Sequence, residues 1–227
     1  MVRQGINGMQ QELSLSEQAY GQLRRKIVRL DFAPGDVLRE DELQELLGIG
    51  RTPIREALQR LAREHFITVI PRRGMFVSGI EVSELSLLFE TRTVLEPYAA
   101  RLAAARGTDE HWYAMEAALA AAHGADGNLD LMDVDRSGHE IMWEAAGNRF
   151  LVDTLDMLYA QSDRLWHLYL ADVADMNHAI DEHAEIMDAL RTGNGDRAGE
   201  LMEEHIRAFD TEIRAAVTER LTSPLAG

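Results

Sequence analysis

The sequence predicts a mainly α-helical chain in two parts: a small N-terminal part with a β-hairpin, and a C-terminal antiparallel bundle of six or seven helices. Runs rich in β-forming residues are confined to the segment before residue 79. From residue 83 onward, helical periodicity alternates with short loops, as in an antiparallel bundle. The 227 residues suffice for two modest domains, each with a core of its own.

The first residues carry no clear periodicity. Residues 1–13 are polar with two glycines, and we expect a flexible arm. Ser14 or Ser16 can cap a helix that runs from about residue 17 to residue 30. A turn signal at residues 32–36 leads to Val37–Leu38, a short strand that could pair with the hairpin.

Two helical patterns, a glycine-containing break and two β-rich runs then follow in order: Glu40–Leu47, Gly48–Gly50, Thr52–Arg63, Ile67–Ile70 and Met75–Val77. Helix, tight turn, helix and small hairpin make a winged helix-turn-helix, which we place at residues 14–78. Such a unit inserts its second helix into the major groove of DNA.

The start of the second helix carries arginines. Thr52 is expected to be the N-cap, with Pro53 at the first helical position, where its missing N–H is no loss. This places Arg51 and Arg55 at the helix end that enters a groove, with Thr52 between them. An arginine can pair bidentately with O6 and N7 of guanine.

The hairpin tip is also basic. Arg72 and Arg73 suit contacts with phosphates, and Gly74 lets the tip turn or approach DNA closely. Residues 1–78 hold 12 Lys+Arg and 10 Asp+Glu, a net charge of +2, whereas the remainder holds 11 and 29, a net charge of −18. The overall charge of −16 therefore belongs to the second part, which we expect to stay off DNA.

The order of these motifs, Leu38-Arg39-Glu40, then Arg51 to Leu58, then Arg73 to Val77, resembles the DNA-binding domain of the GntR superfamily of bacterial transcription regulators. The resemblance implies that four residues contact operator DNA: Arg39, Arg51, Arg55 and Gly74. Gly50 departs from the family pattern, which often has Ser or Thr there. His65 stands where a glycine often ends the recognition helix.

The amino-acid composition restricts the expected cellular location of the protein. The chain has no cysteine, no apolar run near 18 residues and no signal-peptide pattern at its start. These absences predict a cytoplasmic protein with no membrane contact.

A short linker, residues 79–82, leads to an all-helical domain at residues 83–222. Pro97 should kink or split its first long helix. Gly147 suits the end of a helix, and Asp196 can cap the last one.

Four polar residues of this domain could form a metal site. Asp135 and His139 are four residues apart and share one helix face, whereas His183 and His205 lie on two other helices. Three imidazoles and one carboxylate suit one divalent transition metal per chain: zinc, our first choice, or nickel, manganese or iron. Spacing leaves an ordinary buried polar cluster open as the alternative. The remaining histidines have no motif and are expected at the surface or in local hydrogen bonds.

A second resemblance covers this domain. Arg92 to Glu96, Asp135 with His139, Ala146-Gly147-Asn148, Glu182-His183 and Glu204-His205 resemble the FCD ligand-binding domain of the FadR-like branch. It implies metal binding by Asp135, His139, His183 and His205, and it implies that Arg92 helps hold an organic-acid effector beside the metal. A salt bridge from Arg92 to Glu90 or Glu96 remains the alternative.

Together these observations predict a homodimeric transcription regulator that binds double-stranded operator DNA. We expect a repressor that a small carboxylate effector releases from its operator. The alternative is a metal-dependent enzyme that acts on a small carboxylate and has an accessory DNA-binding domain. Glu140, Glu182 and Glu204 adjoin the metal-ligand candidates, but neighbouring residues on a helix point about 100° apart, so none makes a convincing catalytic base.

Overall fold

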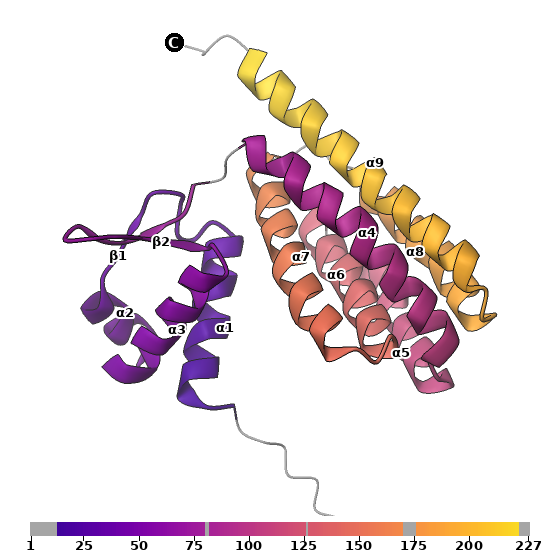
Figure 1. The fold of residues 1–227 in the computed structure, drawn as a ribbon, viewed down its shortest axis with the longest axis horizontal. Helices are drawn as coiled ribbons and strands as arrows, with labels where there is room; N and C mark the ends of the chain where they lie inside the picture. The colour runs from indigo at the N-terminus through magenta and orange to yellow at the C-terminus, as the bar shows by residue number, and fades with distance from the viewer. Residues whose placement is uncertain (1–12, 80–81, 126, 170–175, 223–227) are drawn as a thin grey trace, which may run out of the picture. The chain divides into compact units, whose positions relative to one another are not determined.

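The computed structural model describes residues 13–79, 82–125, 127–169 and 176–222 (Figure 1). The chain divides into two compact units, residues 1–79 and residues 80–227. The described residues form α-helices, one short 3-10 helix and one small sheet, which confirms the predicted fold class. Among them, no helix combines the length and apolar character needed to cross a lipid bilayer.

The first unit packs three helices together: α1 (Leu15–Val28), α2 (Glu40–Leu47) and α3 (Arg51–Arg63). Ser14 caps α1, because its Oγ accepts the N–H of Glu17 while the Glu17 carboxylate accepts the N–H of Ser14. The helices meet through buried apolar side chains, which include Leu23, Ile27, Leu43, Ile54, Leu58 and Leu61.

The start of α3 differs from the prediction. The N-cap is Gly50 rather than Thr52, and α3 begins at Arg51, so Pro53 is the third helical residue instead of the first. Proline is tolerated there because the N–H groups of the first turn have no acceptor within the helix. Gly50 offers no side-chain cap bond. The helix therefore begins with an arginine in its first position.

The small sheet has three antiparallel strands in the order β1-β3-β2: β1 (Val37–Leu38), β2 (Ile67–Ile70) and β3 (Gly74–Val77). Leu38 lies opposite Met75, which confirms that the first short strand pairs with the hairpin. Gly74 begins β3 with φ +114°, a conformation that side chains rarely adopt. This positive φ is the reason for a glycine at the hairpin tip.

The second unit is a bundle of six α-helices in the part of the chain that the structure describes, with a 3-10 turn at Ala121–Gly124 after the second of them. They are α4 (Val82–Arg106), α5 (Asp109–Ala120), α6 (Asn128–Ala145), α7 (Arg149–Tyr169), α8 (Met176–Arg191) and α9 (Gly195–Thr222). The long helices α4 and α9 lie side by side (Figure 1). The number of helices agrees with the prediction.

Two details of the bundle differ from the sequence analysis. Pro97 lies inside α4, which stays a single helix, so of the kink or split expected at this proline, the split does not occur. The last helix is capped by Asn194 instead of Asp196, because Asn194 Oδ1 accepts the N–H of Arg197 at 3.2 Å. Residues 1–12 of the arm predicted at residues 1–13 lie outside the described residues.

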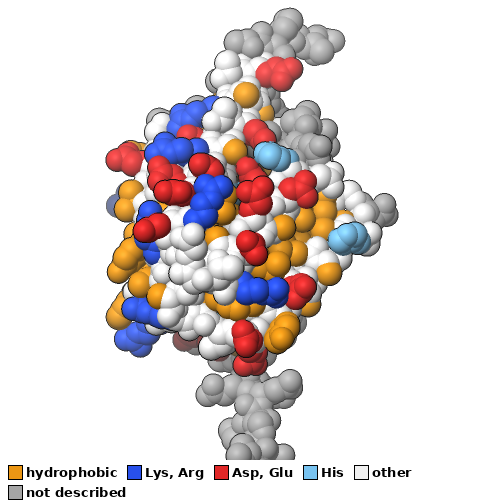
Figure 2. Space-filling view, turned by 90° about the vertical axis from the view of Figure 1, so that its right-hand side faces the viewer, with side chains coloured by type: hydrophobic (Ala, Val, Ile, Leu, Met, Phe, Trp, Pro, Cys, Tyr) orange, Lys and Arg blue, Asp and Glu red, His pale blue; other side chains and the backbone are white. Residues whose placement is uncertain are grey.

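The bundle core is largely apolar and contains the buried rings of Trp143, Tyr159 and Trp166. The outer face seen in Figure 2 carries acidic side chains interspersed with basic and apolar ones, as expected of a solvated surface. Buried polar residues are present within the same core: Arg92, Glu96, Asp135, His139, Ser162, Asp163, Arg164, His183 and His205. This polar group is unusual, because burying charged side chains is costly unless they are paired.

Candidate metal centre and DNA-contacting residues

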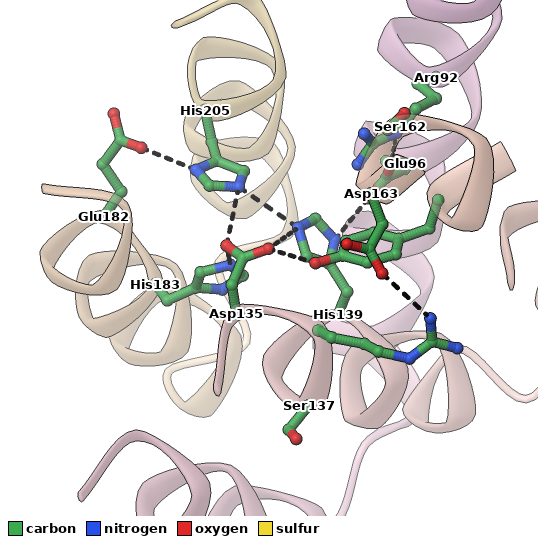
Figure 3. Close-up of polar contacts among 12 residues, drawn as sticks. Arg92, Glu96, Asp135, Ser137, His139, Ser162, Asp163, Glu182, His183 and His205 are labelled. Carbon is green, nitrogen blue, oxygen red and sulfur yellow. Dashed lines mark hydrogen bonds and ion pairs between the residues drawn. The ribbon is translucent and has the colours of Figure 1, made fainter. Parts of the chain in front are cut away.

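The four candidate metal ligands meet inside the bundle. Asp135 and His139 project from α6, His183 from α8 and His205 from α9, and all four are buried (Figure 3). The spacing of four residues places the two α6 side chains on the same buried helix face. One potential ligand atom from each residue lies within 4.8 Å of all the others.

The Nε2 atoms of the three imidazoles face the Asp135 carboxylate. His183 Nε2 lies 2.9 Å from Asp135 Oδ1, and His205 Nε2 lies 3.6 Å from the same oxygen. The Nε2 atoms of His139 and His205 are 3.3 Å apart. Ligands about 2.1 Å from one ion lie roughly 3.0–4.2 Å from each other. The three quoted distances therefore suit a single divalent ion, whose positive charge would satisfy the lone pairs of all three rings. The limit of 4.8 Å for the whole set is wider than this range, so the ligands would draw closer on binding.

Three further side chains hold the ligands in place. Nδ1 of His205 contacts Glu182 Oε2 at 2.7 Å, and the hydroxyl of Tyr159 donates to Asp135 Oδ2 at 2.6 Å. Nδ1 of His139 lies 2.6 Å from Glu96 Oε2, within ion-pair distance. Such partners orient metal ligands and fix which ring nitrogen faces the ion.

None of these three residues was predicted to hold a metal ligand. Glu96 was considered only as a salt-bridge partner of Arg92 and Glu182 only as a catalytic base, and Tyr159 carried no signal. A carboxylate four residues before or after an arginine or histidine is common on any helix surface. Only the packing of α4, α7 and α8 around the ligands distinguishes them.

The absence of a side chain at Gly138 makes room for the His183 ring beside α6. A Cβ atom added at Gly138 would lie 3.0 Å from His183 Nδ1 and 3.2 Å from Cε1 of the same ring. Such contacts are tighter than almost all that a real Cβ makes. A glycine between Asp135 and His139 therefore lets the α8 imidazole lie directly against α6.

The electrostatics of the cluster favour ionised carboxylates. Burial opposes ionisation of Asp135, but the neighbouring His183, His139 and His205 lower the pKa of that carboxyl well below its usual range. Burial also opposes ionisation of Glu96, and the Arg92 guanidinium together with His139 nonetheless lowers the pKa of Glu96. Both carboxylates are therefore charged at neutral pH.

The pKa values of two of the imidazoles, His183 and His205, are shifted in opposite directions. Burial lowers the pKa of His183 to about 4, although Asp135 favours its protonation. Burial also opposes protonation of His205, but hydrogen bonding to Glu182 and the charge of Asp135 raise the pKa of His205 above its ordinary value. His183 is thus ready to bind a cation at neutral pH, whereas at His205 a cation must compete with the proton that the raised pKa favours.

Arg92 has a partner within its own helix. Its Nε donates to Glu96 Oε1 at 2.6 Å, and both side chains are almost completely buried. The structure therefore contains the salt bridge that the sequence analysis held as the alternative, but buried in the core. An unpaired Arg92 awaiting an anion is ruled out.

A small cavity adjoins three of the four ligands, Asp135, His139 and His205. Its volume of about 10 Å³ is enough for one water molecule. Its lining combines the polar cluster with apolar side chains: Arg92, Met132, Asp135, His139, Tyr159, Ser162, His205, Ile206 and Phe209. Arg92 and two metal-ligand histidines thus face a common space.

The predicted DNA-contacting residues are exposed in the first unit. Arg51, Thr52 and Arg55 lie in the first two turns of α3, and Arg39 directly precedes α2. The hairpin tip exposes Arg72, Arg73 and Gly74. Two of the arginines already have acidic partners, since Arg55 pairs with Glu40 and Arg39 pairs with Glu42.

Comparison with known protein families agrees with both units. Residues 15–77 match the model of the bacterial regulatory proteins of the gntR family, and residues 87–208 match the FCD domain. The chain belongs to the GntR family of transcription regulators and carries an FCD domain. This confirms both resemblances and the regulator interpretation rather than the enzyme alternative.

Among its relatives, the transcriptional repressor RspR of Escherichia coli K12 is 28% identical over 203 residues, covering 88% of this chain and 89% of that protein. The repressor GlaR of the same organism is also 28% identical, over 82% of this chain and 90% of GlaR.

Solved structures share the fold. The E. coli McbR/YncC structure gives a TM-score of 0.79 at 20% identity, over 89% of this chain and 98% of that chain. A GntR regulator from Rhodococcus sp. RHA1 gives 0.71 at 22% identity, over 90% and 99%.

Proposed function

We propose that this protein is a repressor that binds operator DNA through residues 14–78 and is released by a small organic acid. In this proposal, residues 83–222 bind one divalent transition metal, with zinc as the first candidate, and the acid binds beside it. Residues 79–82 join the two domains. Two relatives, RspR and GlaR, are named as repressors, which supports this direction of control.

The observation that carries the proposal is the set of four buried ligands on three helices. Each histidine presents Nε2 to the Asp135 carboxylate, and carboxylates behind two of the rings contact Nδ1. A buried cluster of this composition is expensive for a fold unless an ion or a full set of hydrogen bonds compensates it. The Nε2 atoms of His139 and His205 lie 3.3 Å apart beside the Asp135 carboxylate, and an ion bound between them would compensate the burial of both lone pairs.

The position of Arg92 supports the proposal that the effector is a carboxylate. Its guanidinium borders the same cavity as His139 and His205. A carboxylate that binds the ion could also take hydrogen bonds from Arg92, whose five N–H donors are not all used by Glu96. Because the cavity holds about one water, effector binding requires the lining side chains to move apart.

A homodimer is part of the proposal. One recognition helix reads only a few base pairs, and two-fold symmetry doubles the specific contact. In the bundle, α4 exposes three large apolar side chains, Leu87, Val94 and Tyr98, each more than half exposed. Positions separated by seven and four residues share one face of a helix, and this face supports contact with a second copy.

The test combines metal analysis with DNA binding. Protein purified without chelator is expected to contain about one divalent metal per chain. A thermal-shift screen of small carboxylates, with and without added metal, should find an acid that raises the melting temperature and weakens operator binding. His183→Ala should lose most of the metal and most of the effector affinity while it still forms the dimer.

Two results would refute parts of the proposal separately. A parent protein that stays metal-free with zinc, nickel and manganese at neutral pH would leave the four residues as a buried polar cluster. A parent protein with no preference for any DNA sequence would refute operator binding.

A further inference from the structure

Glu40 forms a two-point ion pair with the predicted base-reading arginine. Nε of Arg55 donates to Glu40 Oε1 at 3.0 Å, and a terminal nitrogen of the same guanidinium donates to Oε2 at 2.9 Å. Nε of Arg51 lies 3.9 Å from Glu40 Oε2. The carboxylate at the first position of α2 thus lies between the two arginines at the start of α3.

This pairing leaves the DNA-reading capacity of Arg55 intact. A guanidinium has five N–H donors in one plane, and the contact with Glu40 uses two of them on one edge. Two of the three remaining donors lie on the edge formed by the two terminal nitrogens. Two parallel N–H groups are what O6 and N7 of guanine accept. Arg55 can therefore keep its contact with Glu40 while it contacts a guanine.

The pair also restricts the side chain before DNA arrives. Arg55 is more than half exposed, and an exposed arginine otherwise samples many rotamers. The fork of two hydrogen bonds fixes the plane of the guanidinium as well as its position. At the same time, an acidic group beside the reading arginine repels phosphates that approach in a wrong register.

We propose that Glu40 is a positioning residue for operator recognition: it holds the Arg55 guanidinium in the orientation that reads a guanine and disfavours DNA in other registers. The inference rests on the proposed operator binding. The simpler role of Glu40 is local, because an acidic residue in the first turn of α2 also interacts favourably with the helix dipole. The two roles differ in whether the effect of Glu40 depends on Arg55.

The experiment uses the full chain and two duplexes: one selected by the parent protein from a random-sequence pool, and a scrambled version of equal length. Dissociation constants are measured at one salt concentration for the parent, Glu40→Gln, Glu40→Ala, Arg55→Ala and the Glu40→Gln/Arg55→Ala double variant. Glu45→Gln is the matched control, because it removes the same charge from an exposed position of the same helix. Melting temperatures check that each variant is folded.

The ratio of the two dissociation constants should fall about tenfold in Glu40→Gln and in Glu40→Ala, the discrimination typical of one bidentate base contact. It should change less than twofold in Glu45→Gln. In the Arg55→Ala background, Glu40→Gln should have almost no further effect, because the guanidinium it positions is gone.

Two outcomes would overturn the inference while leaving operator binding established. One is an unchanged ratio in both Glu40 variants when Arg55→Ala loses its preference. The other is an equal fall of the ratio in Glu45→Gln, or an undiminished effect of Glu40→Gln in the Arg55→Ala background. Either result would attribute the effect of Glu40 to net charge or helix stability.

Discussion

Gly138 offers the sharpest test of the metal centre, because its replacement changes no ligand. In Gly138→Ala, the new methyl group would lie 3.0 Å from His183 Nδ1, so the ring or the facing helices must shift by a few tenths of an ångström. Alanine at the same time favours the helix by about 0.5–1 kcal/mol over glycine. The two effects oppose each other in the metal-free protein, and its stability should change little.

Metal binding should respond more strongly than stability. Disturbing a group that orients a metal ligand typically costs 10–100-fold in affinity. A tenfold loss lowers the metal-linked stabilisation by about 1.4 kcal/mol at a fixed excess of metal. For a chain of this size, that corresponds to roughly 3–5 °C less increase in melting temperature when metal is added.

The assay compares melting temperatures with chelator and with a fixed zinc concentration, together with calorimetric zinc affinity. Gly21→Ala is the control: it also places alanine in a helix, but its new Cβ meets no atom within 4 Å. It should keep the parental zinc response. If Gly138→Ala binds zinc as tightly as the parent, His183 is not a ligand in the observed orientation.

Three further predictions concern DNA, the effector and pH. Arg55→Ala should cost about 1–3 kcal/mol of operator affinity and relax base preference at one position per half-site, whereas Arg72→Ala should weaken all sequences evenly; equal operator binding by Arg55→Ala and the parent would contradict the placement of the recognition helix. Arg92→Met should abolish the effector response in the operator-binding assay and leave operator binding intact, and unchanged effector affinity would assign Arg92 to its salt bridge alone. Zinc affinity, measured by competition, should fall as pH drops through the raised pKa of His205, because zinc must displace that proton. The stability of the metal-free protein has the opposite pH dependence. Protonated His205 stabilises its fold at low pH, and this contribution is lost as pH rises through the folded pKa. A pH-independent zinc affinity would contradict the assignment of His205 as a ligand.

The sequence predicted the architecture because its signals are local. Helical periodicity, the glycine break after α2 and the turn before Gly74 each depend on residues within one or two turns. The misplaced caps have a local cause as well. Thr52 and Asp196 are good capping residues, but both helices begin one residue before those positions, which leaves Gly50 and Asn194 as the caps.

The sequence predicted only part of the candidate site. Asp135 and His139 share a helix, so their proximity follows from spacing, whereas nothing in the sequence brings His183 and His205 to them. The family resemblance supplied that link. The contacts of Tyr159 with Asp135 and of Glu40 with Arg55 join residues 24 and 15 positions apart, and only the packing of separate helices reveals them.

The charges around the cluster give a reason for the metal and the acid to act together. Asp135, Glu96 and Glu182 contribute three carboxylates whose pKa values are lowered, and Arg92 contributes one positive charge. With neutral imidazoles, this leaves two net negative charges, an environment that disfavours an anionic effector. A divalent cation balances them and adds a site for a carboxylate oxygen. On the proposed function, acids should therefore bind only to metal-loaded protein. By linkage, the same acids should tighten metal binding by an equal factor.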